Sequence, residues 1–207
     1  MLRNLRRDHL LFAALFGLGV VLMGSIWAGT SRSLAQTPPP ADAPVLEIAV
    51  AGDASGTIRI ALRPDLAPRH VEQVVALAEA GAYDGIVFHR VIDGFMAQTG
   101  DVQFGRIDGD RARVGTGGSD LGNLPAEFSD EPFARGTMGM ARSAHPDSAN
   151  SQFFLMFAPA PHLNGQYTVL GQITEGLDVL DAIKRGRGPN GAVTGTPDVM
   201  ESVRVIR

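Results

Sequence analysis

The alternation of hydrophobic and polar positions predicts a β-hairpin at the start of the folded region. VLEIAV (residues 45–50) and TIRIAL (residues 57–62) alternate with a period of about two, which is typical of half-buried strands. The intervening GDASG is rich in turn residues. The two strands are therefore expected to pair antiparallel.

The period changes from two to that of a helix after Leu66. Apolar residues now recur at i, i+3, i+4 and i+7, at Val71, Val74, Val75 and Ala78. Pro68 suits a first helical turn and Gly81 a helix end. The pattern predicts one amphipathic helix.

The rest of the chain reads mainly as short strands. The strand-like segments are GIVFHRVI, FMAQTG, GTMGMA, SQFFLMF, QYTVLGQI and the final ESVRVIR. EGLDVLDAIKRG predicts a second helix, and residues 105–122, rich in Gly and Asp, predict a long loop. No alternation of strand and helix is present, so we expect a mainly β fold: a closed antiparallel barrel with two helices packed outside it.

The first 35 residues are predicted to be an export signal. They combine a basic start (MLRNLRRDH), an apolar core of 20 residues and the small residues SLA at 33–35, which predict cleavage after Ala35. The apolar core is also long enough to span a bilayer, so an uncleaved membrane anchor is the alternative. Either way the domain is exported, to the periplasm, with a membrane-anchored periplasmic form or secretion as alternatives. Residues 36–44, QTPPPADAP, form a Pro-rich linker, and residues 45–207 form one domain.

Charge and composition exclude several classes of function. Removing the four arginines and one acid of residues 1–35 leaves 14 of 18 basic and 21 of 22 acidic residues, which argues against a nucleic-acid partner. The chain has no cysteine, so neither a disulfide framework nor thiolate chemistry is expected. Its five histidines show no metal-binding spacing. No metal or cofactor is therefore predicted.

Arg90 stands inside one of the most apolar segments, FHRVIDGFMAQTGD. Strand alternation places it on the face of Phe88 and Ile92, where a charged side chain needs a partner or a ligand. Residues predicted to share this face are Phe95, Met96, Gln98, Gln152 and Phe154. They would form an apolar pocket with a few directional hydrogen-bonding groups.

Simpler interpretations exist for single members of this set. Arg90 alone could form a salt bridge with Asp93 or Asp101. Phe153 points away from Phe154 and is expected in the core, and His89 is expected to be a hydrogen-bonded wall residue rather than a general base. The combination with the other pocket residues favours a ligand for Arg90.

Four separated motifs resemble, in order and spacing, the cyclophilin-type peptidyl-prolyl cis-trans isomerases. They are FHRVIDGFMAQTGD, GTMGMARS, NSQFFLMF and HLNGQYTVLGQITEGLDVL, and the resemblance runs from about residue 44 to the end of the chain. It implies an eight-stranded barrel capped by two helices, with a groove for proline peptides on its outer surface. It also implies that no cofactor is needed.

The resemblance assigns a role to each matching position. Arg90 would be the catalytic arginine, and Phe95, Met96, Phe154 and Leu163 would form the walls of the proline pocket. Gln98 and Gln152 would contact the peptide backbone, and Ala141 and Arg142 would line the neighbouring substrate channel.

Three positions depart from the common family pattern. His162 replaces a tryptophan, Tyr167 a histidine and Arg142 an asparagine found in many members, within a segment one residue longer than usual. The changes should alter peptide and inhibitor preference at the substrate-binding rim more than isomerisation. Binding of cyclosporin A, which uses the tryptophan in the family, is expected to be weak.

The predicted function is rotation about X–Pro bonds in unfolded exported proteins, by a monomer whose partners are proline-containing polypeptides. Nothing but the N-terminal segment, if uncleaved, is expected to meet a membrane. The alternative is a catalytically weak module that only holds proline segments. A hydrolase is disfavoured because no activated nucleophile is present.

Overall fold

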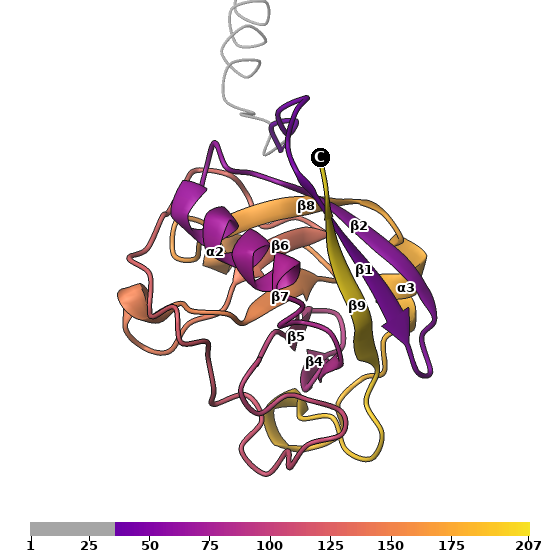
Figure 1. The fold of residues 1–207 in the computed structure, drawn as a ribbon. Helices are drawn as coiled ribbons and strands as arrows, with labels where there is room; N and C mark the ends of the chain where they lie inside the picture. The colour runs from indigo at the N-terminus through magenta and orange to yellow at the C-terminus, as the bar shows by residue number, and fades with distance from the viewer. Residues whose placement is uncertain (1–35) are drawn as a thin grey trace, which may run out of the picture. The chain divides into compact units, whose positions relative to one another are not determined.

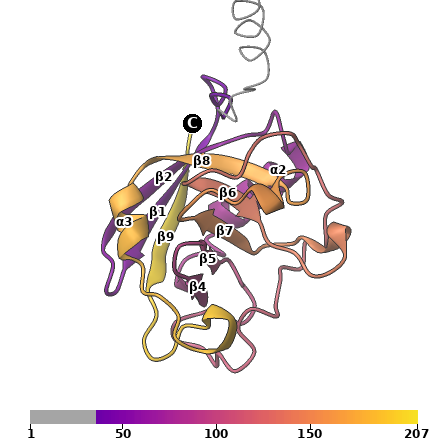
Figure 2. The same ribbon diagram turned by 180° about the vertical axis from the view of Figure 1, so that it is seen from behind.

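The computed structural model describes residues 36–207, and in this range all strands belong to one antiparallel sheet (Figures 1 and 2). The strand order is β3-β9-β1-β2-β8-β6-β7-β5-β4. The strands are β1 (Val45–Ala51), β2 (Gly56–Leu62), β3 (Ile86–Val87), β4 (Arg90–Ile92), β5 (Met96–Thr99), β6 (Thr137–Met140), β7 (Phe153–Met156), β8 (Val169–Glu175) and β9 (Val199–Ile206). The export signal and anchor predictions concern residues 1–35 and lie outside the described residues.

The predicted hairpin and both predicted helices are confirmed. β1 pairs with β2 in a register that places Leu46 opposite Ile60. α2 (Pro68–Glu79) buries Val71, Val74 and Ala78 of the predicted apolar stripe, while Val75 is only partly buried. α3 (Leu177–Ala182) is shorter than its pattern suggested; Gly176 precedes it in a left-handed conformation, with no room for a side chain against Thr57. The two helices lie on opposite sides of the curled sheet in both views (Figures 1 and 2).

The closed eight-stranded barrel that the sequence predicted is not confirmed. Residues 36–207 form a curled sheet of nine strands instead. The difference arises because the segment predicted as one strand, residues 86–92, is two. Its first part, β3, pairs with β9, and its second part, β4, pairs with β5. Between them, Phe88 donates its N–H to Asp198 and His89 donates to Gln98, so the chain changes partner within two residues. The two ends of the strand order are thus successive parts of one segment.

This break also corrects the predicted faces of the segment. Phe88 is fully buried in the main core, together with Val91, whereas Arg90 is only half-buried and turns to the other side. The expectation that Phe88 and Arg90 share a face is therefore wrong. A period-two rule holds only within one continuous strand.

Within residues 36–207, the buried hydrophobic residues form two clusters. The larger one fills the inside of the curled sheet with residues from β1, β2, β9 and α2, such as Leu46, Ile60 and Val74. The smaller one contains Met96, Phe133, Phe154, Met156, Ala160, Leu163 and Val169, with Phe95 and Tyr167 partly buried against it. The smaller cluster carries the candidate site.

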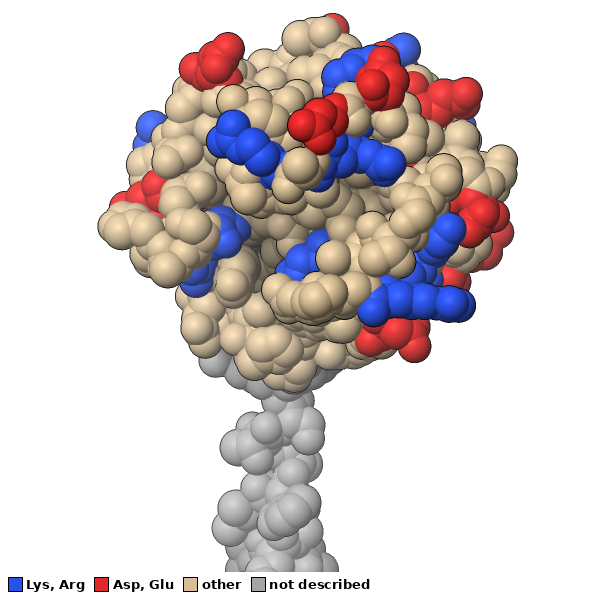
Figure 3. Space-filling model, turned by 90° about the horizontal axis from the view of Figure 1, so that it is seen from below, with Lys and Arg blue, Asp and Glu red and all other residues tan. Residues whose placement is uncertain are grey.

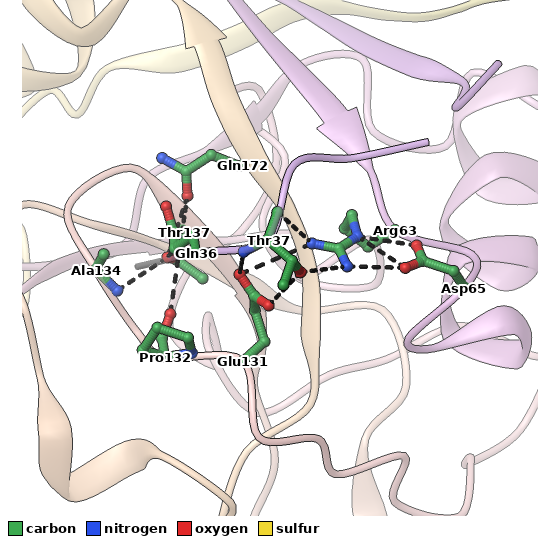
Figure 4. Close-up of polar contacts among 9 residues, drawn as sticks. All are labelled: Gln36, Thr37, Arg63, Asp65, Glu131, Pro132, Ala134, Thr137 and Gln172. Atoms are coloured by element: carbon green, nitrogen blue, oxygen red, sulfur yellow. Dashed lines mark hydrogen bonds and ion pairs between the residues drawn. The ribbon is translucent and has the colours of Figure 1, made fainter. Parts of the chain in front are cut away.

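Residues 36–44 contain no helix or strand, but they do not hang free of the domain. Gln36 and Thr37 form hydrogen bonds with residues that follow them by up to 136 positions in the sequence (Figure 4). The segment predicted to be a linker is thus anchored at its first two residues. Between Gln36 and Arg207 no helix combines the length and apolar character needed to cross a bilayer.

Candidate functional site

Strand register places three predicted site residues in one row. Arg90 on β4 lies opposite Gln98 on β5, which lies opposite Phe154 on β7, which in turn lies opposite Gly139 on β6. Gly139 is required here, because a Cβ at this position would come within 2.5 Å of both the Phe133 and Phe154 rings. The row therefore presents a cation, an amide and an aromatic ring side by side.

Arg90 is held by three neutral acceptors rather than by a carboxylate. Its Nε donates to the backbone oxygen of Asn190 at 3.0 Å, its Nη2 to Asn190 Oδ1 at 3.1 Å and its Nη1 to Gln98 Oε1 at 3.1 Å. Partial burial lowers the pKa of the guanidinium, but an arginine still keeps its charge at neutral pH. Of its five N–H groups, two have no partner among the described residues.

The salt-bridge interpretation of Arg90 fails, because both candidate carboxylates are engaged elsewhere. Asp93 pairs with Arg185 at 2.9 Å on the surface. Asp101 is buried and accepts backbone N–H groups from Gly115, Gly117 and two residues near its own position. Its role is to fold the Gly-rich loop.

Asn190 is a site residue that the sequence analysis missed. It lies in the short turn Pro189–Gly191 with a left-handed backbone (φ 55°), which asparagine tolerates better than most residues. Gly191, which follows it, packs against Ile92 so closely that a Cβ would lie 2.4 Å from that side chain. The PNG sequence was a detectable turn signal, but nothing in it indicated Arg90 as the neighbour.

Two glutamines extend the row from Arg90 along the groove. Gln98 Nε2 donates to Gln152 Oε1 at 2.9 Å, and Gln152 Nε2 donates to the carbonyl of Gly117 at 2.8 Å. Because Gln98 accepts from Arg90 and donates to Gln152, the orientation of its amide is fixed. Arg90 and the loop of Gly117 are therefore joined by one chain of hydrogen bonds.

Two adjoining cavities form the groove. The first, of about 150 Å³, is lined by nine predicted residues: Arg90, Phe95, Met96, Gln98, Ala141, Arg142, Phe154, Leu163 and Tyr167. The second, of about 250 Å³, shares Gln98, Ala141 and Arg142 with the first and adds Gln152. His162 does not line either cavity; it is exposed, and its ring packs against Phe95 with 5.6 Å between ring centroids. Ten of the eleven predicted residues thus line one continuous groove.

Arg142 stands at the border of the two cavities. Its guanidinium donates to the backbone oxygens of Ser143, Ala144 and Gln166 and lies 4.3 Å above the Tyr167 ring. No Asp or Glu is among the residues, all within 36–207, that line these two cavities. The view from below shows a hollowed face with Lys and Arg side chains in and beside the hollow, while most acidic ones lie toward the outline (Figure 3). The groove of this acidic chain is therefore locally basic.

His89, next to Arg90, does not form the hydrogen bonds that the sequence suggested. It is 8% exposed, and neither ring nitrogen has a hydrogen-bond partner in the described part of the chain. Burial lowers its pKa to about 4; the Asp101 charge opposes this shift and the Arg90 charge adds to it. His89 is thus a buried neutral imidazole at physiological pH.

The low pKa of His89 predicts a pH-dependent stability. An unfolded histidine titrates near 6.5, so the unfolded chain binds an extra proton below that pH. The contribution of neutral His89 to the free energy of unfolding should be fully present above pH 6.5. Up to about 3 kcal/mol of it should be lost on acidification to pH 4. His89→Leu should lack this component in urea unfolding at pH 4 to 7.5. Parallel pH profiles of the two proteins would contradict the assignment.

Comparisons with known proteins agree with this geometry. Residues 45–205 match the family model described as cyclophilin type peptidyl-prolyl cis-trans isomerase/CLD. A probable peptidyl-prolyl cis-trans isomerase of Brucella suis is 59% identical over 150 residues, which are 71% of this chain and 76% of the relative. A peptidyl-prolyl cis-trans isomerase of Helicobacter pylori is 41% identical over 152 residues, 72% of this chain and 80% of the relative.

Solved structures show the same fold. A cyclophilin from Hirschia baltica superposes with a TM-score of 0.62 and 26% identity, covering 77% of this chain and 72% of the other. A Cryptosporidium parvum cyclophilin-type isomerase, solved in the presence of the dipeptide Ala-Pro, has a TM-score of 0.66 and 24% identity, covering 79% and 99%. From residue 45 to residue 205, the chain belongs to the cyclophilin-type peptidyl-prolyl cis-trans isomerases.

Proposed function

We propose that Arg90 drives rotation of the X–Pro bond by donating a hydrogen bond to the prolyl nitrogen. In the planar amide the nitrogen lone pair is delocalised into the carbonyl, which creates a rotation barrier of about 18–20 kcal/mol. In the twisted amide that lone pair is localised and accepts a hydrogen bond. A donor at this place stabilises the twisted state more than either planar state and lowers the barrier.

The observation that supports this mechanism is the state of the Arg90 guanidinium. Asn190 and Gln98 fix its plane through three N–H groups, and two further N–H groups remain for a substrate. They stand at the border of a cavity walled by Phe95, Met96, Phe154 and Leu163, which suits a pyrrolidine ring. The ring would be held there while the residue before it rotates. Exclusion of water strengthens the hydrogen bond.

The adjoining cavity extends this groove for the peptide on one side of the proline. Gln98 and Gln152 offer amide groups along it, and Arg142 offers a cation at the border. The Cryptosporidium parvum relative was solved with Ala-Pro, which is consistent with a proline-peptide ligand for this chain. A protease-coupled assay on an Ala-Pro test peptide, with and without the chain, tests the activity directly.

We further propose that the substrates are exported proteins whose folding waits for X–Pro isomerisation, uncatalysed over about 10–100 s. The support is the N-terminal sequence pattern alone. The only tryptophan, Trp27, precedes the predicted cleavage site. A protein cleaved after Ala35 should therefore show tyrosine emission alone after cell fractionation. Tryptophan emission from native protein in the membrane fraction would indicate the uncleaved anchor.

Weak cyclosporin A binding is proposed from His162. An imidazole exposes less apolar area than an indole and donates from a different position. His162→Trp should therefore strengthen inhibition by about tenfold, consistent with one gained hydrogen bond of about 0.5–1.5 kcal/mol plus added aromatic contact. Each protein is titrated against its own uninhibited rate. A variant no more sensitive than the parent would show that this position does not set drug affinity.

A further inference from the structure

A second cavity, with a cluster of polar contacts, surrounds Gln36 and Thr37 outside the groove. Gln36, Thr37, Pro38 and Pro39 line a cavity of about 160 Å³ together with Arg63, Glu131, Val169, Gly171 and Gln172. None of these residues lines either cavity of the groove. Figure 4 shows Thr37 between the side chains of Arg63 and Glu131, with Gln36 beside Thr137 and Gln172. Nothing in the proposed isomerase mechanism uses this cluster.

Thr37 uses every polar group it has in this site. Its N–H donates to Glu131 Oε1 at 2.9 Å, and its hydroxyl donates to Glu131 Oε2 at 2.6 Å. Its carbonyl accepts from Arg63 Nη1 and its hydroxyl oxygen from Arg63 Nη2, both at 2.9 Å. Arg63 and Glu131 therefore bind both the backbone and the hydroxyl group of Thr37.

Arg63 and Glu131 are buried charges that depend on this contact. Each side chain is only 6% exposed, and their closest approach to each other is 3.8 Å, too long for a direct hydrogen bond. Arg63 donates hydrogen bonds to the Asp65 carboxylate from both Nε and Nη2. Thr37 lies in the space between Arg63 and Glu131. Buried charged groups are costly when their hydrogen bonds are not satisfied, so an empty site would be unfavourable.

Gln36 provides a second anchor in the neighbouring position. Its Nε2 donates to Thr137 Oγ1 at 2.7 Å and to Gln172 Oε1 at 2.8 Å. Gln172 is itself oriented, because its Nε2 donates to the carbonyl of Arg135. The acceptors for Gln36 therefore stand in place through contacts of their own.

We propose that Arg63, Glu131 and Gln172 form a peptide-anchoring site whose ligand is the chain's own Gln-Thr pair, Gln36 and Thr37, and whose selectivity rests on the Thr37 hydroxyl. We call these two bound residues, Gln36 and Thr37, the clasp. The clasp makes the start of the Pro-rich segment part of the folded domain instead of a free spacer.

The test compares full-length variants by hydrogen–deuterium exchange at the amide of position 37. Thr37→Val keeps the shape and the backbone but removes the hydroxyl, and it leaves Arg63 and Glu131 each short of a partner. Because hydrogen bonds to charged groups are among the stronger ones, exchange should accelerate by at least about tenfold. Thr37→Ser keeps the hydroxyl and should exchange at the parent rate.

Thr196→Val is the matched control, because Thr196 is exposed and its hydroxyl makes no hydrogen bond within residues 36–207. It should leave the exchange at position 37 unchanged. Exchange in Thr37→Val as slow as in the parent would overturn the proposal, as would equal acceleration in Thr37→Ser. Isomerase activity is measured in parallel and tests the groove separately, since the two sites share no lining residue.

Discussion

Replacing Arg90 with alanine is expected to lower kcat/KM by at least about tenfold, or about 1.4 kcal/mol of transition-state stabilisation. The physical reason is that Asn190 and Gln98 fix the plane of the Arg90 guanidinium at the edge of the first cavity, while two of its five N–H groups have no partner within residues 36–207 and remain for the prolyl nitrogen. Arg90→Lys should restore little, because an ammonium lacks the planar fork that Asn190 and Gln98 hold. The measurement is the protease-coupled rate on one X–Pro peptide.

Arg187→Ala is the control for this prediction. Arg187 is exposed in the neighbouring segment, and its side chain has no hydrogen bond or ion pair with any residue from 36 onward. The Arg187→Ala substitution removes one positive charge, as Arg90→Ala does, but leaves the groove intact. The kcat/KM of this variant should therefore stay within about twofold of the parent. Full activity in Arg90→Ala, with the parent's unfolding midpoint, would refute the role of this arginine.

Phe153→Ala is expected to cost about 3–5 kcal/mol of unfolding free energy. Phe153 is fully buried inside the curled sheet, where its ring meets the edge of Tyr83 with 5.6 Å between centroids. Truncation leaves a closed cavity in the main core. Chemical denaturation measures the loss, and a cost below about 1 kcal/mol would place this side chain outside the core.

Phe154→Ala should have the opposite balance, with a large loss of activity and a smaller loss of stability. Phe154 is 5% exposed and lies between Phe133 and Tyr167, so it is more enclosed than a simple pocket wall. Its truncation nevertheless opens into the groove, where water can enter the space, instead of leaving a sealed cavity. Equal stability losses in the two alanine variants would mean that the two faces of β7 are assigned wrongly.

Much of the fold follows from hydrophobic periodicity. The β1–β2 hairpin and α2 could be predicted because their apolar residues keep one period over a whole element. The break between β3 and β4 could not, since residues 86–92 read as one continuous apolar run. Only the exchange of partners from β9 to β5, which depends on distant strands, divides the run.

The site shows the same limit. Members of the groove could be predicted where they match a family motif. They could also be predicted where a neighbour in sequence lies on the same strand, as for Arg90 on β4 and Gln98 on β5. Asn190 could not, because it reaches Arg90 from 100 positions away. The docking of Gln36 and Thr37 was missed for a related reason: a Pro-rich composition predicts the absence of regular structure, not the absence of contacts.

The most direct measurement of the central claim separates binding from rotation. Exchange NMR on an Ala-Pro peptide bound to the parent and to Arg90→Lys gives both the dissociation constant and the rate of cis–trans exchange on the protein. If Arg90 acts mainly on the twisted amide, the variant should bind within about threefold of the parent and exchange at least about tenfold more slowly. Equal exchange rates on the two proteins would contradict the account.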